Sequence, residues 1–217
     1  MRINDDLSMR TVMHGGQMDW VPSPAPGVER RMLFRQGGEK ARATSIVRYA
    51  PGSRFAAHSH PGGEEFLVLE GTFQDERGDY PAGSYVRNPP DSSHAPASAQ
   101  GCTIFVRLWQ FAQEDCQSSV CREKAPMRPL HLAPGERVSI ENWAPGTWLD
   151  LPNPDGIELL VLSGAFASAE EHLSRWSWLR LPAGEQLTGK VGEEGAQVWI
   201  RRGPLIHPHV VSFEGSQ

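Results

Sequence analysis

Cysteine is scarce in this chain, with only three cysteines among 217 residues. An odd number of cysteines in a chain of this length argues against a disulfide scaffold and is typical of a reducing compartment. Cys116 and Cys121 are separated by four residues and could form a redox pair. Two free thiols are the simpler interpretation. Cys102 falls in a strand-like segment, where it would pack as a small hydrophobic side chain.

Long hydrophobic runs are also lacking, and the first six residues, MRINDD, have no apolar core. We therefore expect no secretory or membrane-spanning segment and a cytoplasmic protein. Positive charge is not in excess either, because the formal net charge is −5 and no basic run is interleaved with aromatic residues. We expect no nucleic-acid partner. Glycine loops for phosphate, nucleophile elbows and dinucleotide-binding fingerprints are missing as well.

Turn residues are plentiful: 22 glycines and 18 prolines lie between short apolar runs. This pattern, with little helical periodicity, predicts an all-β protein of many short strands. The expected strands are 44–49, 66–69, 84–87 and 103–109 in the first half and 138–143, 158–162, 176–181 and 197–202 in the second. The polar segment 110–124 between the halves is expected to be a linker, with or without a short helix.

An internal repeat divides the chain. The segment APG at 50–52 recurs at 144–146, EFLVL at 65–69 recurs as ELLVL at 158–162, and IFVR at 104–107 recurs as VWIR at 198–201. The offsets are all 93 or 94 residues, which indicates a duplication. We predict an N-terminal domain at 1–112, a linker at 113–126 and a C-terminal domain at 127–217.

His58, His60, Glu64 and His94 form a spaced set of metal-ligating side chains. Residues two apart on a strand point to the same face, so His58 and His60 can direct both rings to one ion. Turn residues 61–63 break the strand, so Glu64 can begin the next strand, and His94 arrives from a later hairpin. Three imidazoles and one carboxylate complete the ligand set of a divalent transition metal, and we predict such a site here.

The second copy has lost these ligands. The positions that match His60, Glu64 and His94 are Asn153, Ile157 and Leu187, and His58 falls opposite Leu151 or Asp150. We predict that the second domain binds no metal and that apolar side chains fill its interior. A structural role is then the first interpretation, and a ligand pocket without metal is the alternative.

The spacing of the ligand set resembles the first motif of the cupin superfamily, and Pro89-x-Asp91-x2-His94 resembles the second, which usually has glycine at the position of Asp91. Residues 40–110 also resemble the cupin-like domain of ChrR-type anti-sigma factors, through RYAPGS (48–53), HPGGEE (60–65), GDYPAG (78–83) and YVRNPP (85–90). The resemblance implies two tandem jelly-roll barrels with the metal in the first. It implies that the metal ligands are His58, His60, Glu64 and His94. Glu65 is the competing carboxylate, and the superfamily spacing places it on the opposite face of its strand.

The identity of the metal decides what the site can do. Zinc prefers four ligands, so this set would saturate it and form a stabilising or sensing centre. Iron(II) or manganese prefers six positions, which leaves two for dioxygen or substrate, and nickel is a further candidate.

Two functions follow from the resemblance. The first is regulation of the ChrR type, although the His-x3-Cys-x2-Cys signature of the N-terminal zinc module is missing because no cysteine precedes Cys102. The second is a non-haem iron(II) dioxygenase that cleaves a small diketone or hydroxyketone. Tyr49, Tyr85 and Arg87 are candidate pocket residues, and the alternative for each is an ordinary strand residue. A structural metal in a protein that binds a small molecule or a protein partner is the third interpretation. Homodimerisation is expected by family habit only.

Overall fold

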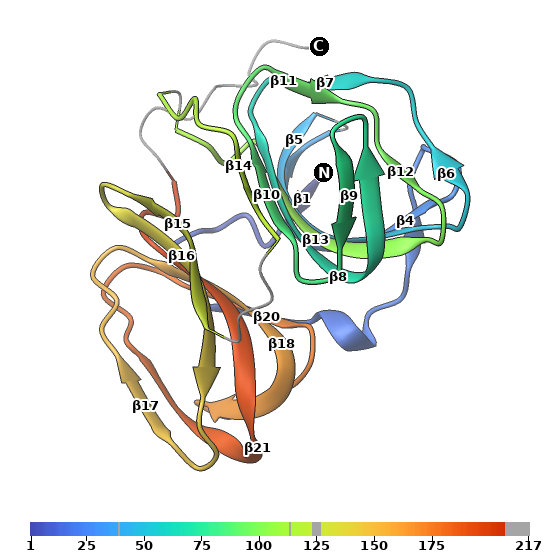
Figure 1. Cartoon of the computed structure of the whole chain (residues 1–217). Coiled ribbons are helices and arrows are strands. Elements are labelled where there is room, and N and C mark those ends of the chain that lie inside the picture. The colour runs from blue at the N-terminus through green and yellow to red at the C-terminus, as the bar shows by residue number, and fades with distance from the viewer. Residues whose placement is uncertain (39, 113, 123–126, 207–217) are drawn as a thin grey trace. The chain divides into compact units, whose positions relative to one another are not determined.

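The computed structural model describes residues 1–38, 40–112, 114–122 and 127–206. Within these residues the secondary structure is β-strand apart from the 3-10 helix η1 (Gly15–Gln17), and no helix could span a bilayer. The all-β prediction is therefore confirmed. The strands form two compact units (Figure 1). The first unit contains Met1–Asp5, the described residues of Asp19–Lys124 and Ile206. The second contains Asp6–Met18 and the described residues of Ala125–Leu205.

The first unit is an antiparallel jelly-roll barrel whose main path of paired strands runs β1-β4-β5-β13-β8-β10-β14. A separate pair, β7 and β11, lies at one end of this unit (Figure 1). The strands of the unit are β1 (Arg2–Ile3), β3 (Val21–Pro22), β4 (Val28–Gly37), β5 (Ala41–Tyr49), β6 (Ser53–Arg54), β7 (His58–His60), β8 (Glu64–Asp75), β9 (Gly78–Pro81), β10 (Tyr85–Asn88), β11 (Ser92–His94), β12 (Ala97–Ser98), β13 (Cys102–Leu108) and β14 (Ser119–Cys121).

The alternation of side chains along β8 defines the interior of this barrel. Glu64, Phe66 and Val68 share one face of the strand, because successive residues point to opposite sides. Phe66 and Val68 are 1% exposed and belong to a buried cluster that includes Ile104 and Val106 of β13. Glu64 therefore projects into the same apolar interior from the start of the strand.

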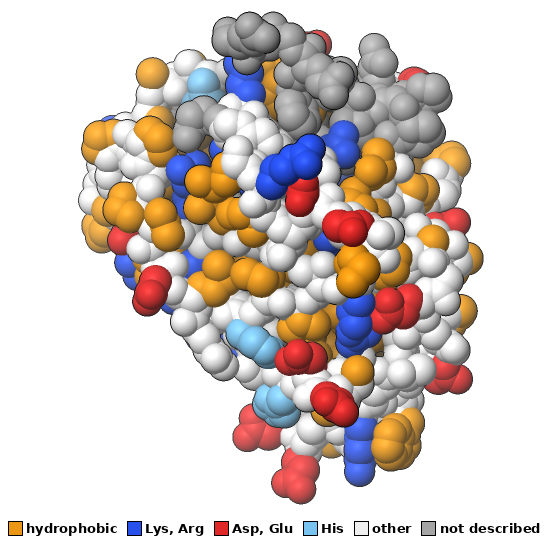
Figure 2. Space-filling view, turned by 180° about the vertical axis from the view of Figure 1, so that it is seen from behind, with side chains coloured by type: hydrophobic (Ala, Val, Ile, Leu, Met, Phe, Trp, Pro, Cys, Tyr) orange, Lys and Arg blue, Asp and Glu red, His pale blue; other side chains and the backbone are white. Residues whose placement is uncertain are grey.

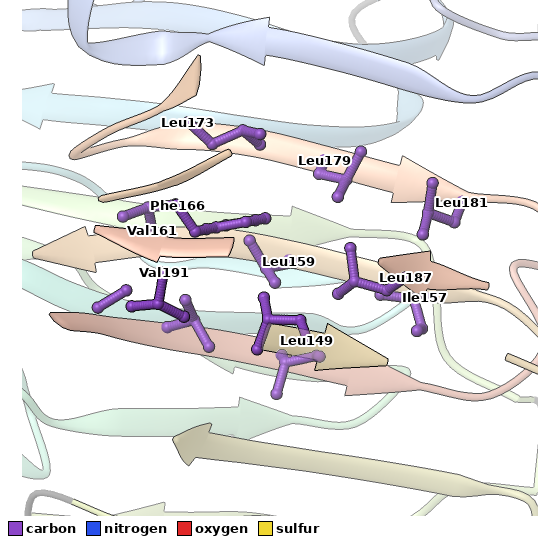
Figure 3. Close-up of a cluster of buried hydrophobic side chains, with 13 residues drawn as sticks. Leu149, Ile157, Leu159, Val161, Phe166, Leu173, Leu179, Leu181, Leu187 and Val191 are labelled. Carbon is purple, nitrogen blue, oxygen red and sulfur yellow. The ribbon is translucent and has the colours of Figure 1, made fainter. Parts of the chain in front are cut away.

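The second unit is a similar barrel, with the path β15-β16-β21-β18-β20-β2. Its interior is a cluster of buried hydrophobic side chains, all aliphatic except Phe166, from β17, β18, β19, β20 and β21 (Figure 3). Ile157 and Leu187, which stand where the first unit has Glu64 and His94, are fully buried in that cluster, so the predicted filling of the interior by side chains is confirmed. The strands of the unit are β2 (Thr11–His14), β15 (Arg128–Ala133), β16 (Glu136–Trp143), β17 (Trp148–Leu151), β18 (Ile157–Ser168), β19 (Glu171–Leu173), β20 (Ser177–Leu181) and β21 (Leu187–Arg202).

The register of the strands repeats between the units, as a duplication requires. In each unit a buried glutamate lies directly between two buried arginines of the flanking strands. The two sets are Arg87, Glu65 and Arg107 in the first unit and Arg180, Glu158 and Arg201 in the second. Gly71 and Gly164 also correspond, with φ of 70° and 69°. A side chain at Gly71 would overlap the backbone carbonyl of Gly101, and one at Gly164 would overlap that of Gly195, so both positions need glycine.

Two segments lie differently from the domain limits expected from sequence. Asp6–Met18 falls in the second unit, where β2 pairs with β20 and covers the backbone groups of a strand whose other edge is paired with β18. The expected linker 113–126 contains β14, which pairs with β10. Both pairings join residues far apart in sequence, and local patterns carry no signal for them.

Basic and acidic side chains are interspersed on the face of the molecule shown in Figure 2. This mixture agrees with the small negative formal charge of −5.

Candidate metal centre

Three histidines converge at the pair of strands β7 and β11. His58 and His60 lie on the same face of β7, and His94 is directly opposite His58 in the register. One ring nitrogen from each of the three lies within 4.8 Å of the other two. The Nε2 atoms of His60 and His94 are 3.0 Å apart. This group of three imidazoles indicates a divalent metal site.

Glu64 approaches the same point from the start of β8. Its Oε2 atom lies 3.4 Å from Nε2 of His94 and 3.6 Å from Nε2 of His60. The turn between His60 and Glu64 is closed by a hydrogen bond of 3.0 Å from the Gly63 amide to the His60 carbonyl. A side chain at Gly62 would overlap the indole ring of Trp109, so packing against Trp109 requires glycine in this turn.

Neighbouring groups orient three of these side chains. Nδ1 of His58 lies 3.2 Å from the Ala56 carbonyl oxygen, so it is placed to donate there and leave Nε2 for a metal. Nδ1 of His94 lies 3.5 Å from a carboxylate oxygen of Asp75, which is an ion-pair distance without hydrogen-bond geometry. Asn88 donates a hydrogen bond of 3.2 Å to Oε2 of Glu64.

Burial prepares the site for a cation. Burial, and next the proximity of His58, lowers the pKa of His60 to about 4. Burial also lowers the pKa of His94, although Glu64 opposes this effect, and burial raises the pKa of Glu64. Both histidines are therefore neutral near pH 7, as ligation requires, and the negative charge of Glu64 is disfavoured until a cation is close. The donor set fits a divalent transition metal.

Glu65 faces away from this centre, as its position next to Glu64 predicts. Its carboxylate accepts hydrogen bonds from Tyr85, Arg87 and Arg107, and the bond from Arg87 Nη1 is 2.7 Å long. Tyr85 and Arg87 therefore belong to a buried ionic network and do not line the pocket proposed from sequence. That part of the sequence interpretation was wrong.

A cavity of about 290 Å³ adjoins the histidines inside the first barrel. His58, His60 and Glu64 form part of its wall, and Tyr49 lines it as the sequence suggested. The other walls are mainly apolar; among the residues that form them are Val28, Val47, Phe55, Ile104, Val106 and Leu108. Sequence reasoning missed the contribution of β4, because 28–37 shows no clean alternation of polar and apolar residues.

Asn153, the counterpart of His60, has a structural role in the second unit. Its Nδ2 atom donates to the carbonyls of Pro182 and Glu185 at 2.8 and 2.9 Å, and its Oδ1 atom accepts from the Gly156 amide at 2.7 Å. The side chain thus joins two loops of the barrel, which accounts for an amide at this position.

Comparisons with known proteins show a family similarity over part of the chain and a shared fold over most of it. Residues 8–112 match the family model of the ChrR cupin-like domain. The bacterial pirin YhhW of Escherichia coli in complex with nickel(II) superposes with a TM-score of 0.70 at 14% identity, over 90% of this chain and 99% of that chain. A protein of Nostoc punctiforme described as a candidate dioxygenase superposes with a TM-score of 0.69 at 14% identity, over 96% of this chain and 88% of that chain. The 11S allergen of Cocos nucifera superposes with a TM-score of 0.63 at 8% identity, over 91% of this chain and 90% of that chain. No curated protein matches the sequence.

Fold and site together define two tandem cupin-like barrels, the first of which holds a group of three histidines suited to a divalent metal. More narrowly, its residues 8–112 are similar to the ChrR cupin-like domain, as the motifs of the sequence indicated.

Proposed function

We propose that the first unit is a metal-dependent site acting on a small molecule, in the class of non-haem iron(II) oxygenases, with His58, His60, Glu64 and His94 as ligands. The observation that carries this proposal is the cavity of about 290 Å³ whose wall includes two of the histidines and Glu64. Structural zinc centres are closed by their protein ligands, whereas catalytic centres keep a position open to substrate. A mainly apolar cavity beside the ligands is the expected form of such an opening.

The residues of the chain have distinct roles in this proposal. The neutral imidazoles hold the metal, and Glu64 reduces its net charge to about +1, which an apolar barrel tolerates better than +2. Val47, Ile104 and Val106 exclude water from the substrate. The chemistry supplied by the metal is polarisation of a substrate oxygen or, for iron(II), oxidation with dioxygen.

Tyr49 contributes a hydrogen-bond donor to the same cavity. Burial, followed by the nearby carboxylate of Glu64, raises the pKa of its hydroxyl well above the ordinary value of 10.0. The phenol therefore keeps its proton at neutral pH and can donate to an oxygen atom of a bound substrate.

The test is metal analysis of protein purified without oxygen or chelators, followed by oxygen-uptake assays with small diketones. We expect about one iron per chain and substrate-dependent uptake, both lost in His60→Ala. His172→Ala, which removes an exposed histidine of the second unit, is the matched control and keeps both. Uptake that is unchanged in His60→Ala would contradict the proposal.

Regulation of the ChrR type is the second candidate, and the family match over residues 8–112 favours it. In this alternative the metal acts as a sensing or stabilising centre. About one zinc per chain, with no oxygen uptake after replacement by iron, would support this candidate over the oxygenase.

A further inference from the structure

His94 has one ring nitrogen at the metal centre and a second that is buried outside it. The residue is 2% exposed, and its Nε2 atom lies 3.0 Å from Nε2 of His60 and 3.4 Å from Oε2 of Glu64. The other nitrogen, Nδ1, is buried and has no hydrogen-bond partner among the described residues. A buried polar atom costs free energy unless a partner satisfies it, so the surroundings of Nδ1 are informative.

Asp75, the last residue of β8, presents its carboxylate to this nitrogen. Its Oδ2 atom lies 3.5 Å from Nδ1 of His94, and its side chain is 1% exposed. The other oxygen, Oδ1, accepts hydrogen bonds of 2.8 Å from the backbone amide of Arg77 and 3.1 Å from the hydroxyl of Tyr80. These two donors hold the carboxylate in one orientation and leave Oδ2 for His94. A displacement of about 0.5 Å brings Oδ2 and Nδ1 within hydrogen-bond distance.

The turn between β8 and β9, residues 76–77, is fixed to both chain neighbours of His94. The glutamate of the turn accepts a hydrogen bond of 2.9 Å from the Ala95 amide. The arginine of the turn donates a hydrogen bond of 3.0 Å to the Ser93 carbonyl. Because the turn follows Asp75 directly in the chain, these contacts keep the carboxylate in place beside the ring.

The second unit shows what this strand end contains where the histidine is replaced. Its strands β18 and β19 pair in the same register as β8 and β9, at an offset of 93 residues. At this offset the counterparts of Asp75, Tyr80 and His94 are Ser168, Leu173 and Leu187. The carboxylate, the phenol and the imidazole are thus replaced together in the copy. This joint replacement links the carboxylate to the metal site and not to the barrel fold.

A carboxylate beside Nδ1 decides which nitrogen of the neutral ring carries the proton. A neutral imidazole has one N–H donor and one nitrogen with a free lone pair. Because a carboxylate oxygen only accepts hydrogen bonds, Asp75 favours the proton on Nδ1 of His94. Nε2 then keeps the lone pair that a metal requires.

We propose that Asp75 is a positioning residue of the metal site, which holds the ring proton of His94 on Nδ1 and thereby leaves Nε2 for the metal. The consequence for metal binding rests on the proposed function, because it needs His94 as a ligand. The position of the ring proton does not, because it depends on the contact between Asp75 and His94.

The test is nitrogen-15 NMR of the His94 ring in the metal-free protein at pH 7, where burial lowers the pKa of the ring and keeps it neutral. We expect the proton on Nδ1 in the wild type. Asp75→Asn should move it to Nε2, because the donors to Oδ1 retain the amide oxygen and turn the amide nitrogen towards His94. Asp79→Asn is the matched control. Asp79 is an exposed residue of the same hairpin that accepts from Gln74, so this variant should keep the wild-type tautomer.

Zinc affinity, measured by competition titration, tests the consequence for the metal. We expect Asp75→Asn to weaken zinc binding at least about tenfold and Asp79→Asn to leave it unchanged. A proton on Nε2 in the wild type would overturn the proposal without any variant. A variant Asp75→Asn that keeps the proton on Nδ1, or that keeps the wild-type zinc affinity, would overturn it as well. A wild-type chain that holds no zinc refutes the metal site of the proposed function instead, and the NMR measurements then decide the tautomer assignment on their own.

Discussion

Glu64 and Glu65 are adjacent on β8 and face opposite sides, so replacing each by glutamine should affect a different property: stability for Glu65 and metal affinity for Glu64. Glu65 is 2% exposed and lies between Arg87 and Arg107. Glu65→Gln removes the carboxylate that pairs with both buried guanidinium groups, although Arg87 keeps Asp115 as a second carboxylate partner. Breaking a buried ionic network in this way costs about 3–5 kcal/mol. We expect the free energy of unfolding of the metal-free protein to fall by that amount.

Glu64→Gln should leave the stability of the metal-free protein almost unchanged. Because burial raises the pKa of Glu64, the folded state binds more protons than the unfolded state, and the ionised carboxylate reduces stability at neutral pH. Glutamine removes this cost and keeps an acceptor for Asn88, so we expect a change below about 1 kcal/mol. Metal affinity should fall at least about tenfold, because the one anionic ligand is lost.

The assay for this pair is urea denaturation of the metal-free proteins at pH 7, together with a competition titration of metal affinity. Glu29→Gln, which breaks an exposed pair with Arg48, is the control and should cost about 1 kcal/mol or less. The reasoning is refuted if Glu65→Gln lowers metal affinity as much as Glu64→Gln does. It is also refuted if Glu64→Gln is the more destabilising variant.

Three further predictions concern the turn, the pH dependence and the second core. Gly62→Ala should destabilise the protein by about 1–3 kcal/mol, because the new methyl group overlaps the Trp109 ring, and it should weaken metal binding. Restored metal affinity in the double variant with Trp109→Leu would attribute the effect to this contact. Unchanged metal affinity in Gly62→Ala would contradict the prediction. The free energy of unfolding of the metal-free protein should fall by up to about 3 kcal/mol as the pH falls from 6.5 towards 4. The reason is that His60 has a pKa of about 4 in the folded protein, so the unfolded chain takes up this proton at a higher pH than the folded chain does. Denaturation curves at several pH values should show a weaker dependence in His60→Gln, and an identical dependence would refute the assignment to this residue. Leu159→Ala in the core of the second unit should lower the free energy of unfolding by about 2–5 kcal/mol and leave the metal content unchanged. Calorimetry measures the first quantity and elemental analysis the second.

Much of the fold could be predicted from local signals. Each expected strand coincides with an observed one, because short apolar runs bounded by glycine and proline have few alternative structures. The repeat at offsets of 93 and 94 residues predicted two similar barrels, and the matching registers of Glu65 and Glu158 agree with that duplication. The pairing of β2 with β20 was not predictable, because strand partners distant in sequence leave no local pattern.

The grouping of the histidines could be predicted from the sequence, but the residues that surround them could not. The spacing of His58 and His60 places both rings on one face, and the later hairpin brings His94 beside them, as the sequence indicated. The contribution of β4 to the cavity wall was missed, because it depends on how β4 closes the barrel. Tyr85 was placed in the pocket incorrectly, since its burial against Glu65 follows from register and not from composition.

The most direct test of the open metal site is X-ray absorption spectroscopy of the iron(II)-loaded protein. We expect three imidazole ligands, one carboxylate and further light-atom ligands from solvent, giving more than four ligands in total. The solvent ligands should be displaced when a small diketone is added. A closed four-coordinate spectrum that does not respond to small molecules, or fewer than three imidazoles, would contradict an open metal site in the first barrel.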